Sequence, residues 1–347
     1  MMTENLTLVT TKDKVQIAIW EIFDSQKTHQ CSNVDTNNGS AKNDTVKNDT
    51  VKNDTANQGQ NIFLTHGTFS DKNTCLRIAE YLAELGHHCY IMEWRGHGAS
   101  SLSKDKFNFE TVATYDFAAT FDYLFNELKL SNLHCVTHSG GGACLTMFLI
   151  QNPHYIAKIN SISMFACQVY GAIVNPKNYF KIVAAKLFTR IVGYIPARKL
   201  NMGPINESHH TMNQWYEWNL RKNFHSHFIK QSDIDAAGVK DSAFDNHNRR
   251  KNTTQLTDDD CFDYRQHMAK ITTPIYAISA KGDKFISPSQ GCQSLFNDFS
   301  NPDNVFREYS IINGDLDDYT HSRILNSRPA AKEIWPTVTA WIDEHAN

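Results

Sequence analysis

A serine flanked by small residues is the feature of this sequence that most directly suggests chemistry. Ser139 stands in the segment Val-Thr-His-Ser-Gly-Gly-Gly (residues 136–142), between an apolar run typical of a strand and a segment typical of a helix. A sharp strand-to-helix turn would expose the serine hydroxyl, and only small residues fit on either side of it. Two residues before the serine, Thr137 stands where glycine is usual. The pattern predicts a nucleophilic serine in a small-x-Ser-x-Gly turn.

A serine nucleophile requires a histidine base and an acid that orients the histidine. Asp283 lies in a loop after a late predicted strand, and His321 lies in the loop after the last one. Backbone amides must also stabilise the oxyanion, and Thr68, in a His-Gly-Thr-Phe turn after an earlier predicted strand, can supply one of them opposite Gly140. The expected catalytic residues are therefore Ser139, Asp283 and His321, with an oxyanion hole formed by the amides of Thr68 and Gly140.

Four further residues are candidates for the substrate pocket because of their positions in the sequence: Phe69, His138, Trp215 and Trp218. Phe69 follows the expected oxyanion residue. His138 precedes the serine, and its position fits a packing role as well as it fits a place in the pocket. Trp215 and Trp218 are three residues apart and so share one face of a helix. Such a pair is more often part of a core than of a binding site.

Strand and helix patterns alternate along most of the chain. Two runs with period two, at residues 6–10 and 15–23, predict an antiparallel hairpin. Later apolar runs predict strands at 62–64, 89–92, 133–136, 159–165, 275–278 and 306–312, with helices at 73–85, 109–130, 140–152, 289–299 and 330–344. This alternation predicts an α/β fold with a mostly parallel central sheet and helices on both faces.

Two stretches interrupt the alternation. Residues 24–60 are polar and contain Lys-Asn-Asp-Thr at 42–45, 47–50 and 52–55, which predicts a disordered surface loop. Residues 167–268 show no clear strand pattern and contain an apolar helical stretch at 179–191. They predict a cap or lid domain inserted into a core formed by residues 1–166 and 269–347.

Together these motifs resemble those of the α/β-hydrolase superfamily. The resemblance rests on His66-Gly67, on Glu-Trp-Arg-Gly-His-Gly-Ala-Ser at residues 93–100, on the turn at Ser139, and on the loops of Asp283 and His321. It covers about residues 5–23 and 61–347. It implies an α/β-hydrolase fold with an inserted helical cap, and the hydrolysis of an ester or amide.

Other segments narrow the resemblance without specifying a substrate. Residues 192–203, with the two tryptophans after them, are similar to the cap of bacterial hydrolases grouped with serine-aminopeptidase-like and lysophospholipase-like enzymes. Residues 107–139 are similar to the acid-lipase branch. The resemblance implies a structural role for Arg95 and His97 in the Arg-Gly-His-Gly turn.

The composition argues against several classes of protein. The 34 Lys and Arg residues are balanced by 37 Asp and Glu residues, so the net charge of −3 provides no concentrated basic surface for nucleic acid. No run approaches the roughly 18 apolar residues that a membrane-spanning helix needs, and the N-terminus has no signal-peptide pattern. The eight cysteines contain no Cys-x-x-Cys pair and fit reduced thiols of a cytoplasmic protein.

Histidine pairs could suggest a metal site. They occur at 87–88, 209–210 and 225–227, but none has a recognised ligand spacing, and we expect surface histidines. Asp315, Asp317 and Asp318 precede His321 in the same loop and are expected to be solvated. The proposed chemistry requires no metal and no organic cofactor.

These observations favour a serine hydrolase that cleaves a carboxylic ester, esterase-like or lipase-like, with an apolar acyl substrate of moderate size. An aminopeptidase-type peptidase is an alternative that needs an acid to hold an amino terminus, and Glu207 and Glu217 are the nearest. An acyltransferase and, less favoured, a non-catalytic binding protein are the others. Peripheral membrane contact through residues 179–191 is a minor expectation, and the oligomeric state stays open.

Overall fold

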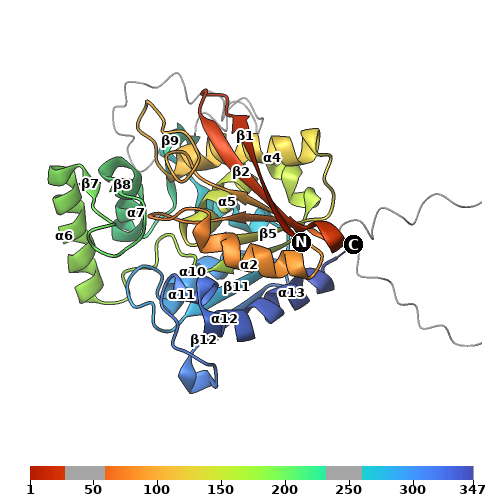
Figure 1. Ribbon diagram of the computed structural model, residues 1–347. Coiled ribbons are helices and arrows are strands. Elements are labelled where there is room, and N and C mark those ends of the chain that lie inside the picture. Colours follow the sequence, from red (N-terminus) through yellow and green to blue (C-terminus); the bar gives the residue numbers. More distant parts are fainter. Residues whose placement is uncertain (28–58, 232–259, 347) are drawn as a thin grey trace, which may run out of the picture.

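The computed structural model describes residues 1–27, 59–231 and 260–346 (Figure 1). The Lys-Asn-Asp-Thr repeats, which we predicted to be disordered, lie outside the described residues. So do residues 232–259 of the predicted cap.

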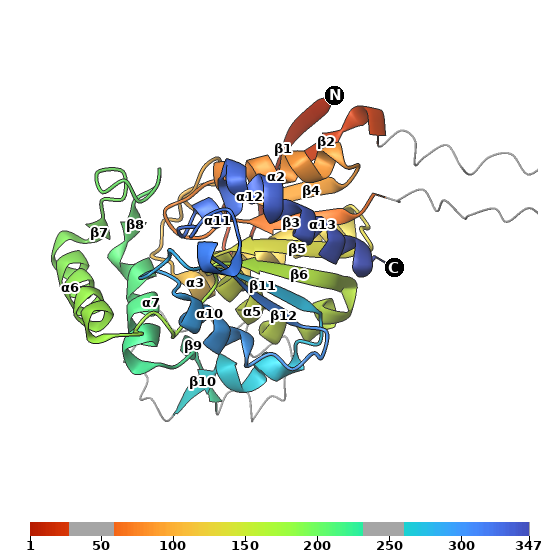
Figure 2. The same ribbon diagram turned by 90° about the horizontal axis from the view of Figure 1, so that it is seen from below.

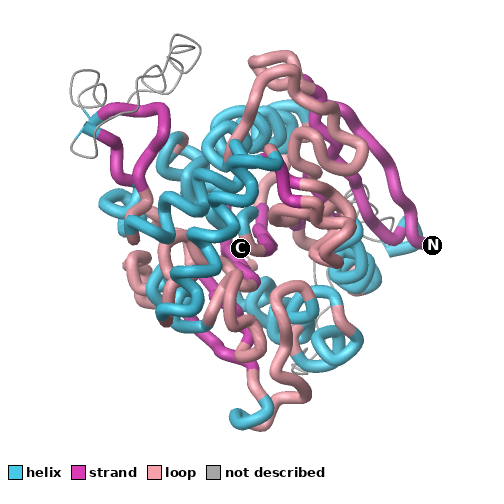
Figure 3. Tube along the Cα trace, turned by 90° about the vertical axis from the view of Figure 1, so that its left-hand side faces the viewer, coloured by secondary structure: helices cyan, strands magenta, loops and turns pink. Residues whose placement is uncertain are grey.

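An eight-stranded sheet forms the centre of the molecule, with the strand order β1-β2-β4-β3-β5-β6-β11-β12. Its strands are β1 (Met2–Thr10), β2 (Gln16–Asp24), β3 (Asn61–Thr65), β4 (His88–Met92), β5 (Leu133–His138), β6 (Ile159–Phe165), β11 (Ile275–Ala280) and β12 (Val305–Tyr309). The pairs β1–β2 and β2–β4 are antiparallel, and all other pairs of this sheet are parallel. The predicted hairpin and the mostly parallel sheet are confirmed, and the hairpin lies at the edge of the molecule (Figure 3).

Neighbouring residues of the central strands point into two different hydrophobic cores. On β3, Phe63 belongs to one buried cluster, while Ile62 and Leu64 belong to the other. On β4, Tyr90 and Ile91 are divided in the same way. Strands buried on both faces are typical of a parallel sheet that is covered by helices on both sides.

The helices of the two covering layers are found close to their predicted positions. They are α2 (Asn73–Glu84), α3 (Phe109–Thr111), α4 (Ala118–Asp122), α5 (Gly140–Gln151), α10 (Ser289–Phe296), α11 (Arg323–Asn326), α12 (Arg328–Glu333) and α13 (Trp335–Glu344). Short π-helices at Val112–Phe117 and Tyr123–Glu127 follow α3 and α4. Short 3₁₀ helices occupy Pro153–Lys158, Tyr264–Lys270 and Ile311–Asn313.

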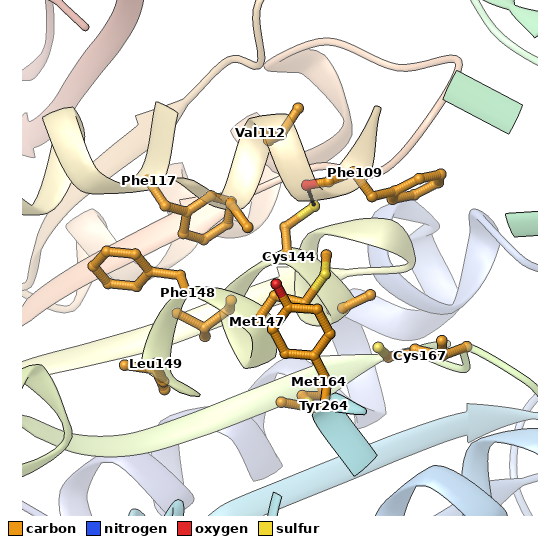
Figure 4. Packing of buried hydrophobic residues seen from close by; sticks show 14 of the residues in the cluster. Phe109, Val112, Phe117, Cys144, Met147, Phe148, Leu149, Met164, Cys167 and Tyr264 are labelled. Atoms are coloured by element: carbon orange, nitrogen blue, oxygen red, sulfur yellow. Dashed lines mark hydrogen bonds between the residues drawn. The ribbon is translucent and has the colours of Figure 1, made fainter. Parts of the chain in front are cut away.

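The two layers use different helices. The side chains of α5 pack with those of residues 109–125 in one cluster, shown in Figure 4, where the Cys144 thiol donates a hydrogen bond to the Phe109 carbonyl. Helix α2 packs with α11, α12 and α13 in the other cluster. The prediction of one last helix at 330–344 is wrong because Pro336, which has no amide hydrogen, begins a separate helix at Trp335.

The chain leaves the sheet between β6 and β11. This part, which we call the inserted segment (residues 167–268), contains α6 (Pro176–Val192), β7 (Tyr194–Ile195), β8 (Glu207–Ser208), α7 (His209–Arg221), β9 (His225–Lys230) and β10 (Cys261–Asp263). The expectation that it lacks strands is wrong. Its strands pair only with one another, β7 with β8 and β9 with β10. Strands β7, β8 and β10 have only two or three residues, too few to produce a periodic pattern, whereas β9 has a polar sequence without an apolar run.

A buried carboxylate joins the inserted segment to the core. Glu110, which is fully buried, accepts hydrogen bonds from the hydroxyls of Ser226 and Tyr264, the amide of His227 and the side chain of Gln214. Burial raises the pKa of Glu110, and these four donors oppose the effect. A buried carboxyl is tolerated only with such partners, so this contact fixes the inserted segment beside α3.

Two further observations complete the description of the fold. Within the described residues, no helix combines the length and the apolar character needed to cross a bilayer. No disulfide joins the described cysteines, and all of them except Cys261 are buried.

Candidate active site

Ser139 lies in a strained turn between β5 and α5. Its backbone has φ 54° and ψ −123°, a conformation that is rare for a residue with a side chain. The glycines after it leave room for close neighbours, since a Cβ atom on Gly140 would lie 2.7 Å from the ring of Phe109, and one on Gly142 would lie 2.6 Å from the sulfur of Cys167. The predicted reason for small residues here, close packing around the turn, is confirmed.

The structure brings the three predicted catalytic residues together. Nε2 of His321 lies 2.9 Å from Oγ of Ser139, and Nδ1 of His321 lies 2.6 Å from Oδ2 of Asp283. Asp283 follows β11, and His321 lies in the loop after β12, so both come from the same ends of parallel strands as the serine. The distances permit proton transfer from serine to histidine and orientation of the histidine by the carboxylate.

The Asp283 carboxylate is ionised although it is buried. Burial by itself would raise its pKa, but the charge and hydrogen bond of His321 and the amides of its own loop lower it below the usual value. Those amides belong to Phe285 and Ser287, at 3.3 and 2.9 Å, and the amide of Ile286 also donates to the carboxylate at 3.0 Å. An ionised carboxylate at this place keeps the histidine proton on Nδ1, which leaves Nε2 able to accept the serine proton.

Two backbone amides are available for an oxyanion next to Ser139. Gly140 is the first residue of α5, so its amide has no acceptor within the helix. Thr68 and Gly140 both line the cavity in front of the serine. The neighbouring amide of Phe69 is already used, since it donates to Glu207 at 3.2 Å. These observations favour the predicted pair over a hole that includes Phe69.

The inserted segment holds the backbone that carries Thr68. Besides the bond from the Phe69 amide to Oε1 of Glu207, the Phe69 carbonyl accepts a hydrogen bond from the amide of Ile205 at 3.2 Å. Sequence reasoning considered Glu207 only as a partner for a peptide amino terminus and missed this positioning role. No local pattern indicates it, because Phe69 and Glu207 are 138 residues apart in the chain.

The Arg-Gly-His-Gly turn is a buried charged structure, as expected from a structural role. Arg95 forms ion pairs with Asp13 and Asp116. His97 places Nδ1 3.0 Å from the carbonyl of Arg95 and Nε2 2.8 Å from Oε1 of Glu207. Both ring nitrogens therefore face acceptors, which requires the protonated imidazolium.

His97 and the nearby His66 have opposite pKa shifts. Burial would lower the pKa of His97, but the Glu207 carboxylate and the Arg95 carbonyl raise it above 6.5. Burial lowers the pKa of His66 well below 6.5. Neutral His66 donates from Nδ1 to the Gly67 carbonyl at 2.7 Å and accepts at Nε2 from the Trp94 amide at 3.3 Å. The two rings lie side by side, with centroids 5.2 Å apart, so a cationic imidazole packs beside a neutral one.

The raised pKa of His97 predicts that stability decreases at alkaline pH. Between pH 6.5, the ordinary value, and the raised pKa, the folded protein holds one proton more than the unfolded chain. The free energy of unfolding should therefore fall by up to about 1.4 kcal/mol per pH unit in this window, and the stabilisation is complete below it. Denaturant unfolding from pH 6 to 9 measures this slope. His97→Gln should reduce it, whereas equal slopes in both proteins would contradict the assignment.

The cavity in front of Ser139 is lined by uncharged side chains. The lining residues are Thr68, Phe69, Phe109, Ser139, Gly140, Ala143, Gln168, Met212, Trp215, Trp218 and Ile286. Its volume is about 410 Å³, including the part that is open to solvent. The predicted pocket residues Phe69, Trp215 and Trp218 are all part of this lining, and the two tryptophans are also buried in the hydrophobic cluster that they share with α5 and the central sheet.

The expectation that His138 lines the pocket is wrong for the described cavity. Its ring packs against that of His321, with centroids 4.8 Å apart, and its Nε2 lies 2.9 Å from the His321 carbonyl. Burial lowers the pKa of His138 to about 3, and repulsion from the nearby His321 adds to this effect. His138 is therefore a neutral donor that supports the backbone of His321 and is not part of the described lining.

Two expectations about other polar residues are also wrong. His87 is buried, not on the surface, because it packs behind β3 and accepts a hydrogen bond from the Gln60 amide. Asp315 is buried and not solvated, because it pairs with Arg307 of β12 and accepts from the Ser310 amide. Among the described residues no group of three or more His, Cys, Asp or Glu side chains is arranged to hold a metal ion.

Comparison with known proteins gives a consistent family. Residues 60–309 match the family model described as alpha/beta hydrolase fold. No curated protein matches the sequence of this chain.

Solved structures with this fold resemble the chain at low identity. An esterase from Exiguobacterium antarcticum has a TM-score of 0.57 at 13% identity, over 97% of this chain and 98% of that one. An esterase of Pyrococcus furiosus has a TM-score of 0.56 at 12% identity, over 100% of this chain and 92% of that one. A monoacylglycerol lipase of Paleococcus ferrophilus has a TM-score of 0.51 at 16% identity, over 83% of this chain and 97% of that one. At such identities the likeness concerns the fold alone.

Proposed function

Because the chain belongs to the α/β-hydrolase fold family, we propose that it is a serine hydrolase that cleaves carboxylic esters with apolar acyl groups. One observation carries this proposal: the hydrogen-bonded series Ser139, His321, Asp283 lies at an uncharged cavity. A serine beside an oriented neutral base is the arrangement that acyl transfer requires.

The mechanism follows from the positions of these groups. Ser139 attacks the acyl carbonyl while His321 removes its proton, and Asp283 stabilises the resulting imidazolium. The amides of Thr68 and Gly140 stabilise the oxyanion, each by about 3 kcal/mol. His321 then gives its proton to the leaving alcohol. Water, activated by the same histidine, hydrolyses the acyl-enzyme and frees the serine.

The lining of the cavity supports an apolar acyl group. Phe109, Met212, Trp215 and Trp218 offer aromatic and aliphatic surface, and the described lining contains no charged side chain. An apolar wall with a few polar groups near the reacting atoms is typical of small-molecule sites. We propose further that residues 167–268 act as a cap, because α7 supplies three of these side chains.

The peptidase alternative is less well supported. An aminopeptidase would need a carboxylate in the cavity to hold the amino terminus of its substrate, but Glu207 is bound to His97 and to the Phe69 amide. Glu217 is bound to Lys186 and Arg221, and neither glutamate is part of the described lining. Both candidate acids thus have other partners, so we retain ester hydrolysis.

A series of p-nitrophenyl esters tests the proposal. The protein should hydrolyse the butyrate and octanoate faster than the palmitate, because bulky side chains such as Phe109, Trp215 and Trp218 line the cavity and leave little room for a long acyl chain. Initial rates at equal ester concentration give the ranking, and a fluorophosphonate probe should label the protein once per chain. Failure of every ester together with absence of labelling would refute the proposal.

A further inference from the structure

Helix α6 buries Ile182 but exposes most of its other large apolar side chains to solvent. Phe180, Leu187 and Ile191 are 67%, 56% and 86% exposed, and with Ala184 and Phe188 they fall on one face of the helix. In both Figure 1 and Figure 2, α6 is the outermost element of the inserted segment, with α7 between it and the sheet. The exposed side chains therefore form a continuous stripe, which we call the α6 stripe.

The opposite face of α6 is the one that packs on the protein, and it is partly polar. Asn178 donates to the carbonyls of Ala172 and Lys284, at 2.8 and 3.0 Å. Thr189 is buried and lies 2.9 Å from Nδ1 of His209. An ordinary surface helix buries its apolar stripe and exposes its polar one. In α6 the inward face combines Ile182 with two polar anchors, while four large apolar side chains face outward, so folding of this chain does not account for the stripe.

The α6 stripe is bordered by positive charge. Lys177, Lys181 and Arg190 lie on α6 beside it, Arg198 and Lys199 follow in the next turn, and all five are exposed. Residues 167–206 contain no Asp or Glu, although the whole chain has a net charge of −3. The stripe thus consists of exposed large apolar side chains, and its border is positively charged.

We propose that the α6 stripe docks the protein on an anionic lipid surface. A helix with an apolar face and flanking Lys and Arg residues lies in the plane of such a surface, with apolar side chains in the acyl boundary and cations near the headgroups. A second copy of the chain fits less well, since a symmetric contact through this face would bring the same basic side chains together. The inference concerns binding and does not depend on the proposed ester hydrolysis.

The buried face of α6 contacts two parts of the chain that lead to the candidate active site, the loop of Lys284 and helix α7. Asn178 of α6 holds the backbone of Lys284, which is two residues from Ile286 in the cavity lining. Helix α6 also packs on α7, which supplies Met212, Trp215 and Trp218 to the same cavity. Docking through α6 would therefore place the wall of the cavity next to the lipid surface.

Sedimentation with vesicles tests the proposal. The full chain should sediment with vesicles of phosphatidylcholine and phosphatidylglycerol, and more weakly with vesicles of phosphatidylcholine alone or at high salt. The double substitution Leu187→Asp and Ile191→Asp should lower the partition coefficient by about ten-fold or more. The matched control is Ile312→Asp, because Ile312 is also 86% exposed but lies outside the inserted segment, and it should bind as wild type does.

Charge reversal provides a second, independent readout. Lys181→Glu with Arg190→Glu should weaken binding to the anionic vesicles by about ten-fold or more, whereas Arg328→Glu with Lys332→Glu on α12 should not. Ser139→Ala should bind as wild type does, which separates this test from the failure of ester hydrolysis. Absence of wild-type binding, or equal binding by the α6 variants, would overturn the proposal. The proposal would also be overturned if the protein formed a dimer in sedimentation velocity, and if Ile191→Asp dissociated this dimer without changing the binding to vesicles.

Discussion

Ser139→Ala should lower kcat for the preferred p-nitrophenyl ester by about 10⁵-fold and abolish labelling by the fluorophosphonate probe. The expected loss is large because removal of Oγ eliminates the acyl-enzyme route, and only cavity binding and the oxyanion amides would remain. Steady-state kinetics and mass spectrometry of the labelled protein measure the two effects. The proposed nucleophile is refuted if the variant keeps more than a tenth of the wild-type kcat.

This substitution should leave the fold unchanged, which makes the loss interpretable. The Ser139 hydroxyl contacts His321, and alanine at the same positive φ has the same backbone strain as serine. The free energy of unfolding should stay within about 0.5 kcal/mol of wild type. Ser294→Ala, an exposed serine on α10, is the matched control and should retain full kcat.

Asp283→Asn should lower kcat by about 10⁴-fold with little change in the position of the side chain. The amide can donate a hydrogen bond to Nδ1 of His321, which moves the ring proton to Nε2 and removes the base that Ser139 needs. The carboxylate also accepts from the amides of its own loop, and asparagine can retain only part of these bonds. Comparison of kcat and KM at constant pH measures the effect, which should fall on kcat.

Asp315→Asn is the control for this second substitution. Asp315 is also a buried, ion-paired carboxylate in the chain before His321, but its partners are Arg307 and the Ser310 amide. Its replacement should reduce the free energy of unfolding and leave kcat within a few-fold of wild type. If Asp315→Asn lost as much kcat as Asp283→Asn, general destabilisation would explain both results, and the orienting role of Asp283 would be refuted.

The fold of this chain was largely predictable from local patterns. The period-two runs at 6–10 and 15–23 became β1 and β2, and the short apolar runs became the parallel strands, since each pattern reflects which side chains one element must bury. Local patterns were less informative where elements are short. Strands β7 and β8 have two residues each, and the break at Pro336 depends on one residue within an otherwise helical pattern.

The sequence by itself determined the candidate chemistry: a serine in a tight turn, and an acid and a histidine after later strands. Parallel strands carry their following loops to one edge of the sheet, so order along the chain was enough to predict their meeting. Only the tertiary structure decided which residues surround them. It packed His138 against His321, placed Glu207 on the Phe69 amide, and left the apolar side of α6 in solvent. These outcomes depend on contacts between residues far apart in the chain. The spacing of apolar residues shows which face of a helix or strand is suited to burial, but it does not show which residues pack against that face.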